Sequence, residues 1–110
     1  MIAVYNIPLR KEYKYKDYLF FINGVLNLTQ KELVILSDFI IVMFEKNEKD
    51  NIFSTEIRKE VAKKNHIKNI NTYVKKYIDN NLVVKKGENY LPNRILIPED
   101  TGVTFNFTWT

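Results

Sequence analysis

One helix limits what this chain can fold into more than any other segment does. The stretch "LTQKEL" places Thr29 at a helix N-cap and Glu32 three residues later, and this capping box satisfies two free backbone N–H groups. The sequence therefore predicts a helix from about residue 30 to 46. Its apolar side chains form two stripes: Leu33, Leu36, Ile40 and Met43, and Ile35, Phe39 and Val42. A helix that is apolar on nearly all sides is buried, so we expect it at the centre of the domain or against a partner subunit.

Length and composition set the class of protein. The chain has 110 residues, the usual size of one domain, so we predict a single domain over residues 1–110. It contains no cysteine, which excludes disulfides, thiolate catalysis and cysteine-based zinc sites and suits a reducing compartment. We expect a cytoplasmic protein of a bacterium or an infected host cell, with the virion as the alternative location. No membrane association is expected, because the longest apolar block, residues 33–44, is well short of the roughly 20 residues that a span needs.

Two further helices and a hairpin are predicted in the second half of the chain. The stretch "STEIRKEVAKKN" (54–65) has the pattern of a helix capped by Ser54 or Thr55. In "IKNINTYVKKYIDNN" (67–81), apolar residues recur along one face with a 3.6-residue period, which predicts an amphipathic helix. The stretch "LVVKKGENYLPNRILI" (82–97) then predicts two strands joined by a tight turn.

The first and last parts of the chain carry weaker signals. Asn23-Gly24 stands between two apolar runs, which allows either a β-hairpin near residues 18–28 or a short helix over 15–22. Residues 2–7 are strand-like, and "GVTFNFTWT" at the C-terminal end alternates apolar and polar residues with the period of a strand. We expect these extra strands to pair within the chain or with a neighbouring chain.

Positive charge gathers in one segment. Residues 52–97 hold ten Lys and Arg against four Asp and Glu, an excess of +6, whereas the rest of the chain has seven against nine and is at −2. An excess confined to one segment is typical of a surface that faces a polyanion such as nucleic acid. The alternative is a lysine-rich face that is merely solvated.

The order of these elements resembles the winged helix-turn-helix family. In that family the second helix of the motif typically ends in Gly-Leu-Val with the hairpin immediately after, and here Asn81 takes the place of the glycine. The stretch "GENYLPNRILIP" is also similar to the wing of small replication and copy-control proteins of plasmids and phages, although a Pro-Asn pair inverts their Asn-Pro. The resemblance covers about residues 29–97. It implies an α+β fold of three helices plus a β-hairpin wing, with extra strands in the extensions 1–27 and 98–110.

The resemblance implies a DNA-binding or DNA-associated protein of the regulator or replication type, whose partner is double-stranded DNA. The recognition helix would be about residues 67–80 and the wing 82–97. The residues that would contact DNA are Lys63, Lys64, Lys68, Asn69, Thr72, Lys75, Lys76, Lys85, Lys86 and Arg94. Of these, Lys68, Asn69 and Thr72 are expected at base edges, and the others at phosphates or in the minor groove.

Arg94 is expected on the return strand of the wing. Asp79 departs from the family pattern, because a carboxylate on the DNA-facing side repels phosphate unless Lys75 or Lys76 pairs with it. A purely structural reading remains open, in which these polar residues form only the solvated side of a helix.

A second hypothesis is a small structural subunit of a tailed-phage particle. Tailed phages use small winged-helix domains in packaging and in head–tail connector rings, so the fold would serve protein–protein assembly there. The apolar helix and both ends of the chain would then pack against further copies of the chain, as a homo-oligomer, or against other phage structural proteins.

Catalysis is not expected. His66 is the only histidine and lies in a turn, as a surface or capping residue. Glu56 and Glu60 share a helix face and are expected to pair with lysines of the same helix. No glycine belongs to a phosphate-binding loop. We therefore predict no enzyme, no catalytic residue, no metal and no cofactor.

Overall fold

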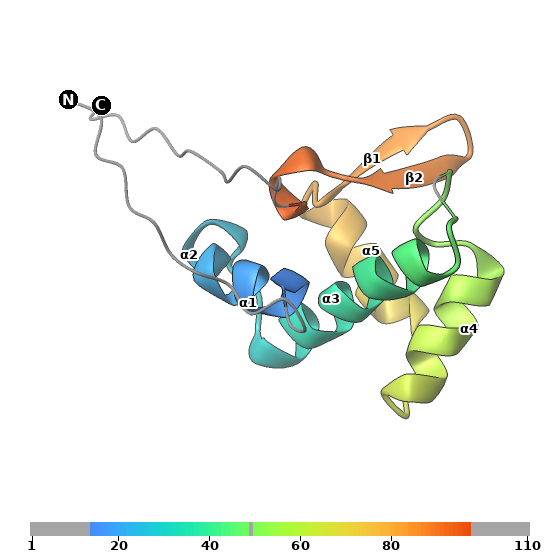
Figure 1. Cartoon of the computed structure of the whole chain (residues 1–110), viewed down its shortest axis with the longest axis horizontal. Coiled ribbons are helices and arrows are strands. Elements are labelled where there is room, and N and C mark those ends of the chain that lie inside the picture. Colours follow the sequence, from blue (N-terminus) through green and yellow to red (C-terminus); the bar gives the residue numbers. More distant parts are fainter. Residues whose placement is uncertain (1–13, 49, 98–110) are drawn as a thin grey trace.

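The computed structural model describes residues 14–48 and 50–97. The strands predicted for residues 2–7 and for the C-terminal stretch 103–109 lie outside these residues. Within the described ranges the chain forms five α-helices, a two-stranded antiparallel sheet and a short 3₁₀ helix (Figure 1). Their bounds are α1 Lys14–Phe21, α2 Asn23–Leu26, α3 Gln30–Glu45, α4 Thr55–Lys64, α5 Asn71–Asp79, β1 Val83–Lys86, β2 Asn89–Pro92 and η2 Arg94–Leu96.

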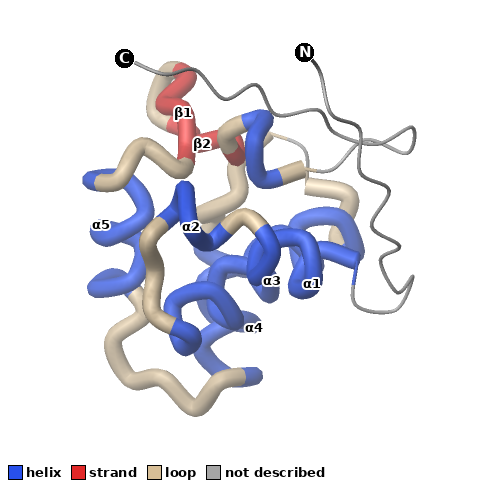
Figure 2. The backbone as a smooth tube through the Cα atoms, turned by 90° about the vertical axis from the view of Figure 1, so that its left-hand side faces the viewer, coloured by secondary structure: helices blue, strands red, loops and turns tan. Residues whose placement is uncertain are grey.

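Helix α3 is the centre of the structure. The predicted capping box is present: the Thr29 hydroxyl accepts from the Glu32 backbone N–H, and the Glu32 carboxylate accepts from the Thr29 backbone N–H at 2.8 Å. Helix α1 lies along one side of α3 and α5 lies on the other (Figure 2). The buried residues of α3 are Leu33, Ile35, Leu36, Ser37, Asp38, Phe39, Ile40, Val42 and Met43. Of the two environments expected for this apolar helix, the interior of its own domain is therefore the observed one.

The N-terminal part of the described chain is helical, so the hairpin alternative near residues 18–28 is wrong. A type I′ turn requires positive φ at both Asn23 and Gly24, whereas the positive φ of this region, +55°, occurs at Asn27, where α2 ends. The Asn23 amide instead bonds both backbone groups of Leu28, accepting from its N–H at 2.9 Å and donating to its carbonyl oxygen at 3.0 Å. The Asn-Gly pair thus begins a second short helix rather than a turn.

Besides α2, which ends at Asn27, three helices are followed by a residue with left-handed backbone. These residues are Asn47 after α3, His66 after α4 and Asn81 after α5, with φ of +52°, +54° and +58°. After α5, the N–H of Leu82 reaches the carbonyl oxygen of Tyr77 at 3.0 Å, which is the hydrogen bond of a Schellman motif. The left-handed conformation predicted at Asn81 is confirmed.

The hairpin follows α5 directly but is shorter than predicted. Strand β1 pairs with β2 from Val83 opposite Pro92 to Lys86 opposite Asn89, which leaves a two-residue turn at Gly87-Glu88. Gly87 has φ +65° and Glu88 does not have positive φ, the pattern of a type II′ turn.

The second strand does not continue to residue 97, because Asn93 ends it. The Asn93 side-chain oxygen accepts from the Ile95 N–H at 3.2 Å and starts the 3₁₀ helix η2. The backbone N–H of Asn93 donates to the Leu82 carbonyl oxygen at 2.9 Å, and its side-chain amide donates to the Asn81 carbonyl oxygen at 3.1 Å. The prediction that Arg94 lies on a return strand is therefore wrong, since Arg94 begins η2.

The hairpin and η2 are tied to the rest of the domain by hydrogen bonds, of which those made by the Asn51 and Tyr18 side chains are partly buried. The Ile52 N–H donates to the Tyr90 carbonyl oxygen at 2.9 Å, and the Asn51 side-chain oxygen accepts from the Tyr90 N–H at 3.2 Å. On the other side, the Tyr18 hydroxyl of α1 donates to the Ile95 carbonyl oxygen at 2.7 Å. Strand β2 therefore lies against the α3–α4 connection, and η2 lies against α1.

Helix α5 is anchored by a single fully buried side chain, that of Tyr77. Its hydroxyl donates to the Glu32 carbonyl oxygen in the first turn of α3 at 2.6 Å. Its ring stacks on Phe53 at a centroid distance of 6.5 Å and meets Phe39 edge-on at 6.2 Å. Burial raises the pKa of the Tyr77 hydroxyl above its ordinary value of 10.0.

The first prediction concerns Tyr77→Phe. The lost hydrogen bond should lower the free energy of unfolding by about 1 kcal/mol at pH 8. A folded-state pKa above the unfolded value stabilises the fold at lower pH, and this contribution is lost as pH rises past 10. Because the unfolded state releases its proton first, the wild type should lose about 1.4 kcal/mol more than the variant between pH 8 and pH 11.

Urea unfolding at both pH values measures this difference. A matched control is Tyr90→Phe, which removes a hydroxyl from a partly exposed ring of the hairpin and tests whether the loss of any tyrosine hydroxyl changes the alkaline slope. If Tyr77→Phe loses as much stability as the wild type on raising the pH, the buried hydroxyl does not control the alkaline behaviour.

Candidate nucleic-acid interface

All ten residues predicted to contact DNA have exposed side chains. They are Lys63, Lys64, Lys68, Asn69, Thr72, Lys75, Lys76, Lys85, Lys86 and Arg94. On the inner side of the same region, Tyr77 is buried, and Ile70, Val74 and Ile78 pack against the core. Segment 68–79 thus turns its polar side outward and its apolar side toward α3.

The helix predicted to begin at residue 67 begins later, at Asn71. Lys68 and Asn69 therefore lie in the connection between α4 and α5, and Thr72 lies in the first turn of α5. The periodicity was misleading because Ile67 and Ile70 pack against the core from within this connection. No side chain caps the N-terminus of α5, so no capping residue in the sequence marked the true start.

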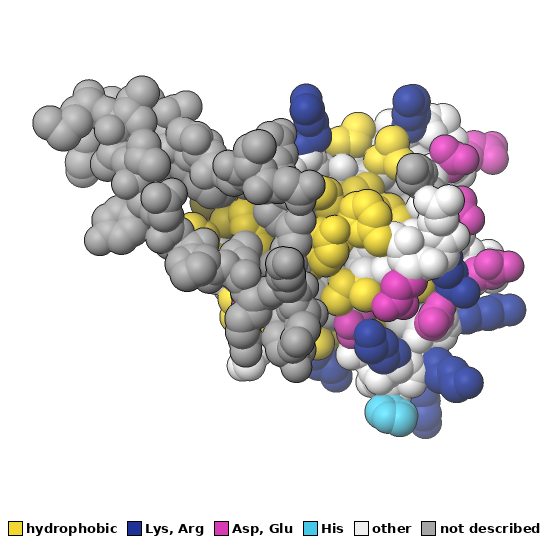
Figure 3. All heavy atoms as spheres, viewed as in Figure 1, with side chains coloured by type: hydrophobic (Ala, Val, Ile, Leu, Met, Phe, Trp, Pro, Cys, Tyr) yellow, Lys and Arg dark blue, Asp and Glu magenta, His cyan; other side chains and the backbone are white. Residues whose placement is uncertain are grey.

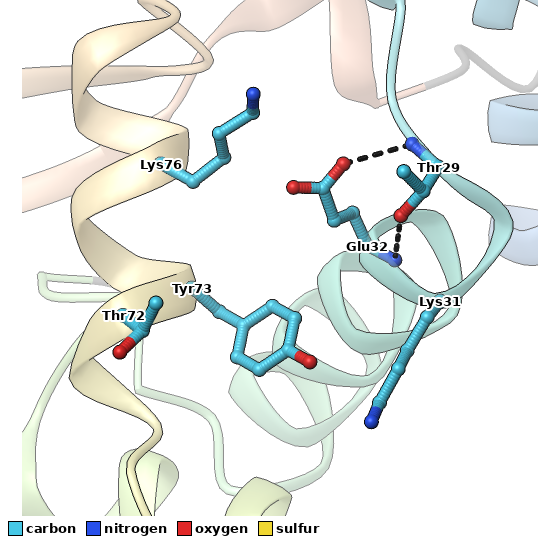
Figure 4. A pocket seen from close by; sticks show the side chains of 6 residues that line it. All are labelled: Thr29, Lys31, Glu32, Thr72, Tyr73 and Lys76. Carbon is cyan, nitrogen blue, oxygen red and sulfur yellow. Dashed lines mark hydrogen bonds between the residues drawn. The ribbon is translucent and has the colours of Figure 1, made fainter.

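Thr72 and Lys76 border a hollow between α5 and the N-terminus of α3 (Figure 4). The hollow has a volume of about 360 Å³, and its lining residues are Thr29, Lys31, Glu32, Thr72, Tyr73 and Lys76. Tyr73 and Lys76 extend from α5 toward α3, and Glu32 extends from the opposite wall. The charges are mixed, with two lysines and one carboxylate. Sequence reasoning missed this hollow because its two walls are some forty residues apart in the chain.

Asp79 is not neutralised by a lysine. The ion pairs within the described ranges are Lys46–Glu60 at 3.0 Å and Lys64–Asp38 at 3.3 Å, and neither includes Asp79. This carboxylate is exposed, and it is the last residue of α5, where the negative end of the helix dipole opposes it. Asp79 is therefore an unfavourable charge both for the helix and for a phosphate beside it.

Lys64 has a partner that the sequence did not indicate. Asp38 of α3 is 8% exposed, and its two carboxylate oxygens bind the Lys64 ammonium at 3.3 Å and the Asn65 amide at 2.9 Å. This pair holds the C-terminal end of α4 against α3. Part of the charge of Lys64 is thereby committed within the protein, whereas Lys63 belongs to neither ion pair of the described residues.

The expected pairing of Glu56 and Glu60 with lysines of their own helix is not what the structure has. Glu60 reaches across to Lys46, the C-cap residue of α3, at 3.0 Å, and its hydrogen bond and negative charge raise the pKa of Lys46. The pairing is therefore between helices and not along one helix.

The hairpin carries its lysines next to its turn. Lys85 and Lys86 are exposed on β1, opposite Tyr90 and Asn89. Figure 3 shows Lys and Arg side chains projecting from the outer edge of the hairpin and a second group over the lower part of α4. His66 is exposed at the left-handed position after α4, as expected for a turn residue.

Comparison with known proteins adds no family to this geometry: no family model, no curated protein and no solved structure matches the chain. Within residues 14–48 and 50–97, no helix is long and apolar enough to cross a membrane. The same part of the chain holds no group of three His, Cys, Asp or Glu residues placed to bind a metal ion.

The second prediction concerns Asp79→Asn. Removing the carboxylate should raise the free energy of unfolding by about 0.3–1 kcal/mol, because it no longer opposes the helix dipole. If α5 faces DNA, the same change should also increase affinity for a short duplex, and the gain should shrink with added salt. Urea unfolding and fluorescence anisotropy measure the two effects.

The control is Asp50→Asn, an exposed acid in the α3–α4 connection, which changes the net charge equally. An equal gain in affinity from both variants would mean that only net charge matters and that α5 has no special place in binding.

Proposed function

We propose that this chain is a winged-helix protein that binds double-stranded DNA in a regulatory or replication role. Three features of the fold support this. Helices α3, α4 and α5 pack around one core, and a hairpin follows α5 at once. Asn51 and Ile52, in the connection between α3 and α4, form hydrogen bonds with Tyr90 of that hairpin. This is the order of elements that a winged helix-turn-helix requires, with α5 as its recognition helix.

The single observation that carries the proposal is the exposure of the outer side of α5. Thr72, Lys75 and Lys76 are exposed, while Tyr77 between them and the core is fully buried. A recognition helix needs this division, because its inner side must fix it to the domain while its outer side enters the major groove.

The later start of α5 leaves the expected roles within this surface unchanged, although Lys68 and Asn69 now precede the helix. Lys68, Asn69 and Thr72 gather at the leading end of the helix, the end whose residues reach base edges in helix-turn-helix proteins. An asparagine can bond adenine through both of its amide groups, and a lysine can reach guanine acceptors. Lys75 and Lys76 lie further along and are placed for phosphates, as Lys85 and Lys86 are on the hairpin.

The third prediction tests this surface with Lys75→Glu combined with Lys76→Glu. If five of the basic residues neutralise phosphates, the logarithm of affinity should fall against the logarithm of salt concentration with a slope of about −4.5. The double variant should bind a short duplex far more weakly, because two attractive charges become repulsive, and its slope should be shallower by about 1.8 or more. Anisotropy titrations at four salt concentrations measure both quantities.

The matched control is Lys16→Glu with Lys59→Glu, which changes the net charge by the same amount but places the substitutions on α1 and α4 instead of α5. It should retain most of the affinity. Unchanged affinity in the α5 variant would refute the recognition-helix assignment.

A second candidate function is assembly into a larger particle, such as a tailed-phage packaging or connector ring. One observation favours it: α1 and α2 leave apolar side chains exposed, Phe20 at 38%, Phe21 at 56% and Val25 at 61%. The burial of α3 within its own domain weighs the other way, because that helix does not need a neighbouring subunit to cover it.

The fourth prediction separates the two candidates by light scattering of the purified chain, with and without a short duplex, at two salt concentrations. A DNA-binding regulator should be a monomer or dimer whose complex with the duplex dissociates at the higher salt concentration. A ring subunit should form a higher oligomer whose mass responds to neither the duplex nor salt.

A further inference from the structure

Arg58 of α4 was not among the predicted DNA contacts, yet it joins the two helices of the motif. Its guanidinium donates to the Asn71 side-chain oxygen, at the first residue of α5, at 3.1 Å, and to the Thr55 hydroxyl at 3.4 Å. The side chain is half-buried. The cation is therefore held at the start of α5, one residue from Thr72.

This cation lacks a counter-charge. Both of its hydrogen-bond acceptors are neutral oxygens, and neither ion pair of the described chain includes it. Its Nε atom is buried and has no hydrogen-bond partner. Asp38 shows the usual arrangement, since that buried carboxylate has both an ammonium and an amide. A partly desolvated charge without an opposite charge is costly, so the free protein would gain stability if an anion bound the Arg58 guanidinium.

We propose that Arg58 binds a phosphate of the DNA backbone and thereby sets the position of the start of α5 in the major groove. The inference rests on the proposed DNA-binding function and assigns that function a further residue. A guanidinium has five N–H donors in a planar fork that matches two phosphate oxygens. In Arg58, one N–H of Nη1 and one of Nη2 hold the group in place, and Nε is buried. The second N–H groups of Nη1 and Nη2 are therefore the donors that a phosphate would meet. Because Asn71 fixes the fork, little side-chain freedom remains to be lost when the phosphate arrives.

The fifth prediction follows from the charge of Arg58. Arg58→Gln should lower affinity for a short duplex and make the salt slope shallower by about 0.9, the effect of one lost phosphate contact. Arg58→Lys keeps the charge but loses the fork, so it should bind more weakly while keeping the slope of the wild type. Lys59→Gln, at the exposed neighbouring position of the same helix, should leave the duplex affinity and the salt slope nearly unchanged.

A purely structural role for Arg58 predicts a different result. In that case Arg58→Gln and Asn71→Ala should lower stability toward urea by similar amounts, and both should keep the salt slope of the wild type. Under the proposal, Asn71→Ala keeps the slope because the guanidinium remains, and only Arg58→Gln reduces it. If Arg58→Gln does not fold, an unchanged slope and unchanged affinity in Arg58→Lys would overturn the proposal, since the fork would then contribute nothing.

The failure of this inference is distinguishable from the failure of the proposed function. A wild-type chain without salt-dependent duplex binding overturns both. The role of Arg58 alone is overturned by three results together. The wild type binds the duplex, the Lys75→Glu/Lys76→Glu variant loses binding, and Arg58→Gln keeps the salt slope of the wild type.

Discussion

The buried ring of Tyr77 is the contact on which the position of α5 depends. It is the one fully buried side chain of that helix, and its hydroxyl is bonded to the first turn of α3. Its ring stacks on that of Phe53, and the Phe53 ring in turn contacts the ring of Tyr90 in the hairpin at a centroid distance of 5.8 Å. One aromatic cluster therefore fixes α5 and the hairpin against α3 together, and the outward direction of the basic residues follows from an apolar interaction on the opposite side of the helix.

Asparagine side chains fix much of the remaining geometry. Asn51 holds β2 against the α3–α4 connection, Asn65 binds Asp38 under the end of α4, and Asn93 closes the base of the hairpin. A side-chain amide can donate or accept, so it can satisfy backbone groups that no helix or strand satisfies. Asn51 accepts from two backbone N–H groups, Asn65 donates to Asp38 and to the Val61 carbonyl oxygen, and Asn93 does both. Asn47 and Asn81 additionally adopt the left-handed conformation that ends helices, at lower cost than most side chains. Asn47 and Asn81 thus take positions that glycine often occupies, and the amides of Asn51, Asn65 and Asn93 hold the connecting segments in place.

The sequence was informative where the signal is local. The capping box at Thr29 gave α3 within one residue, and the left-handed position of Asn81 gave the end of α5. The start of α5, the end of β2 and the ion pairs could not be predicted, because each depends on residues that are distant in the chain or on a competing local bond. Ile67 and Ile70 continue the helical period into a connection, and Asn93 replaces a strand with a 3₁₀ turn. The role inferred for Arg58 could not be predicted either, since the contact with Asn71 joins two helices.

The two candidate functions are less opposed than their classes suggest. A single winged-helix module binds DNA without useful specificity, at roughly 10⁻⁴ to 10⁻⁶ M, and specificity comes from two copies on spaced half-sites. Phe20 and Phe21 are exposed on α1, which lies on the other side of α3 from α5 (Figure 2). Pairing of copies through α1 would leave the outer side of α5 uncovered, so self-association there and DNA binding at α5 are compatible. Self-association excludes DNA binding only if it covers the outer side of α5 itself, because no duplex can then reach Lys75 and Lys76.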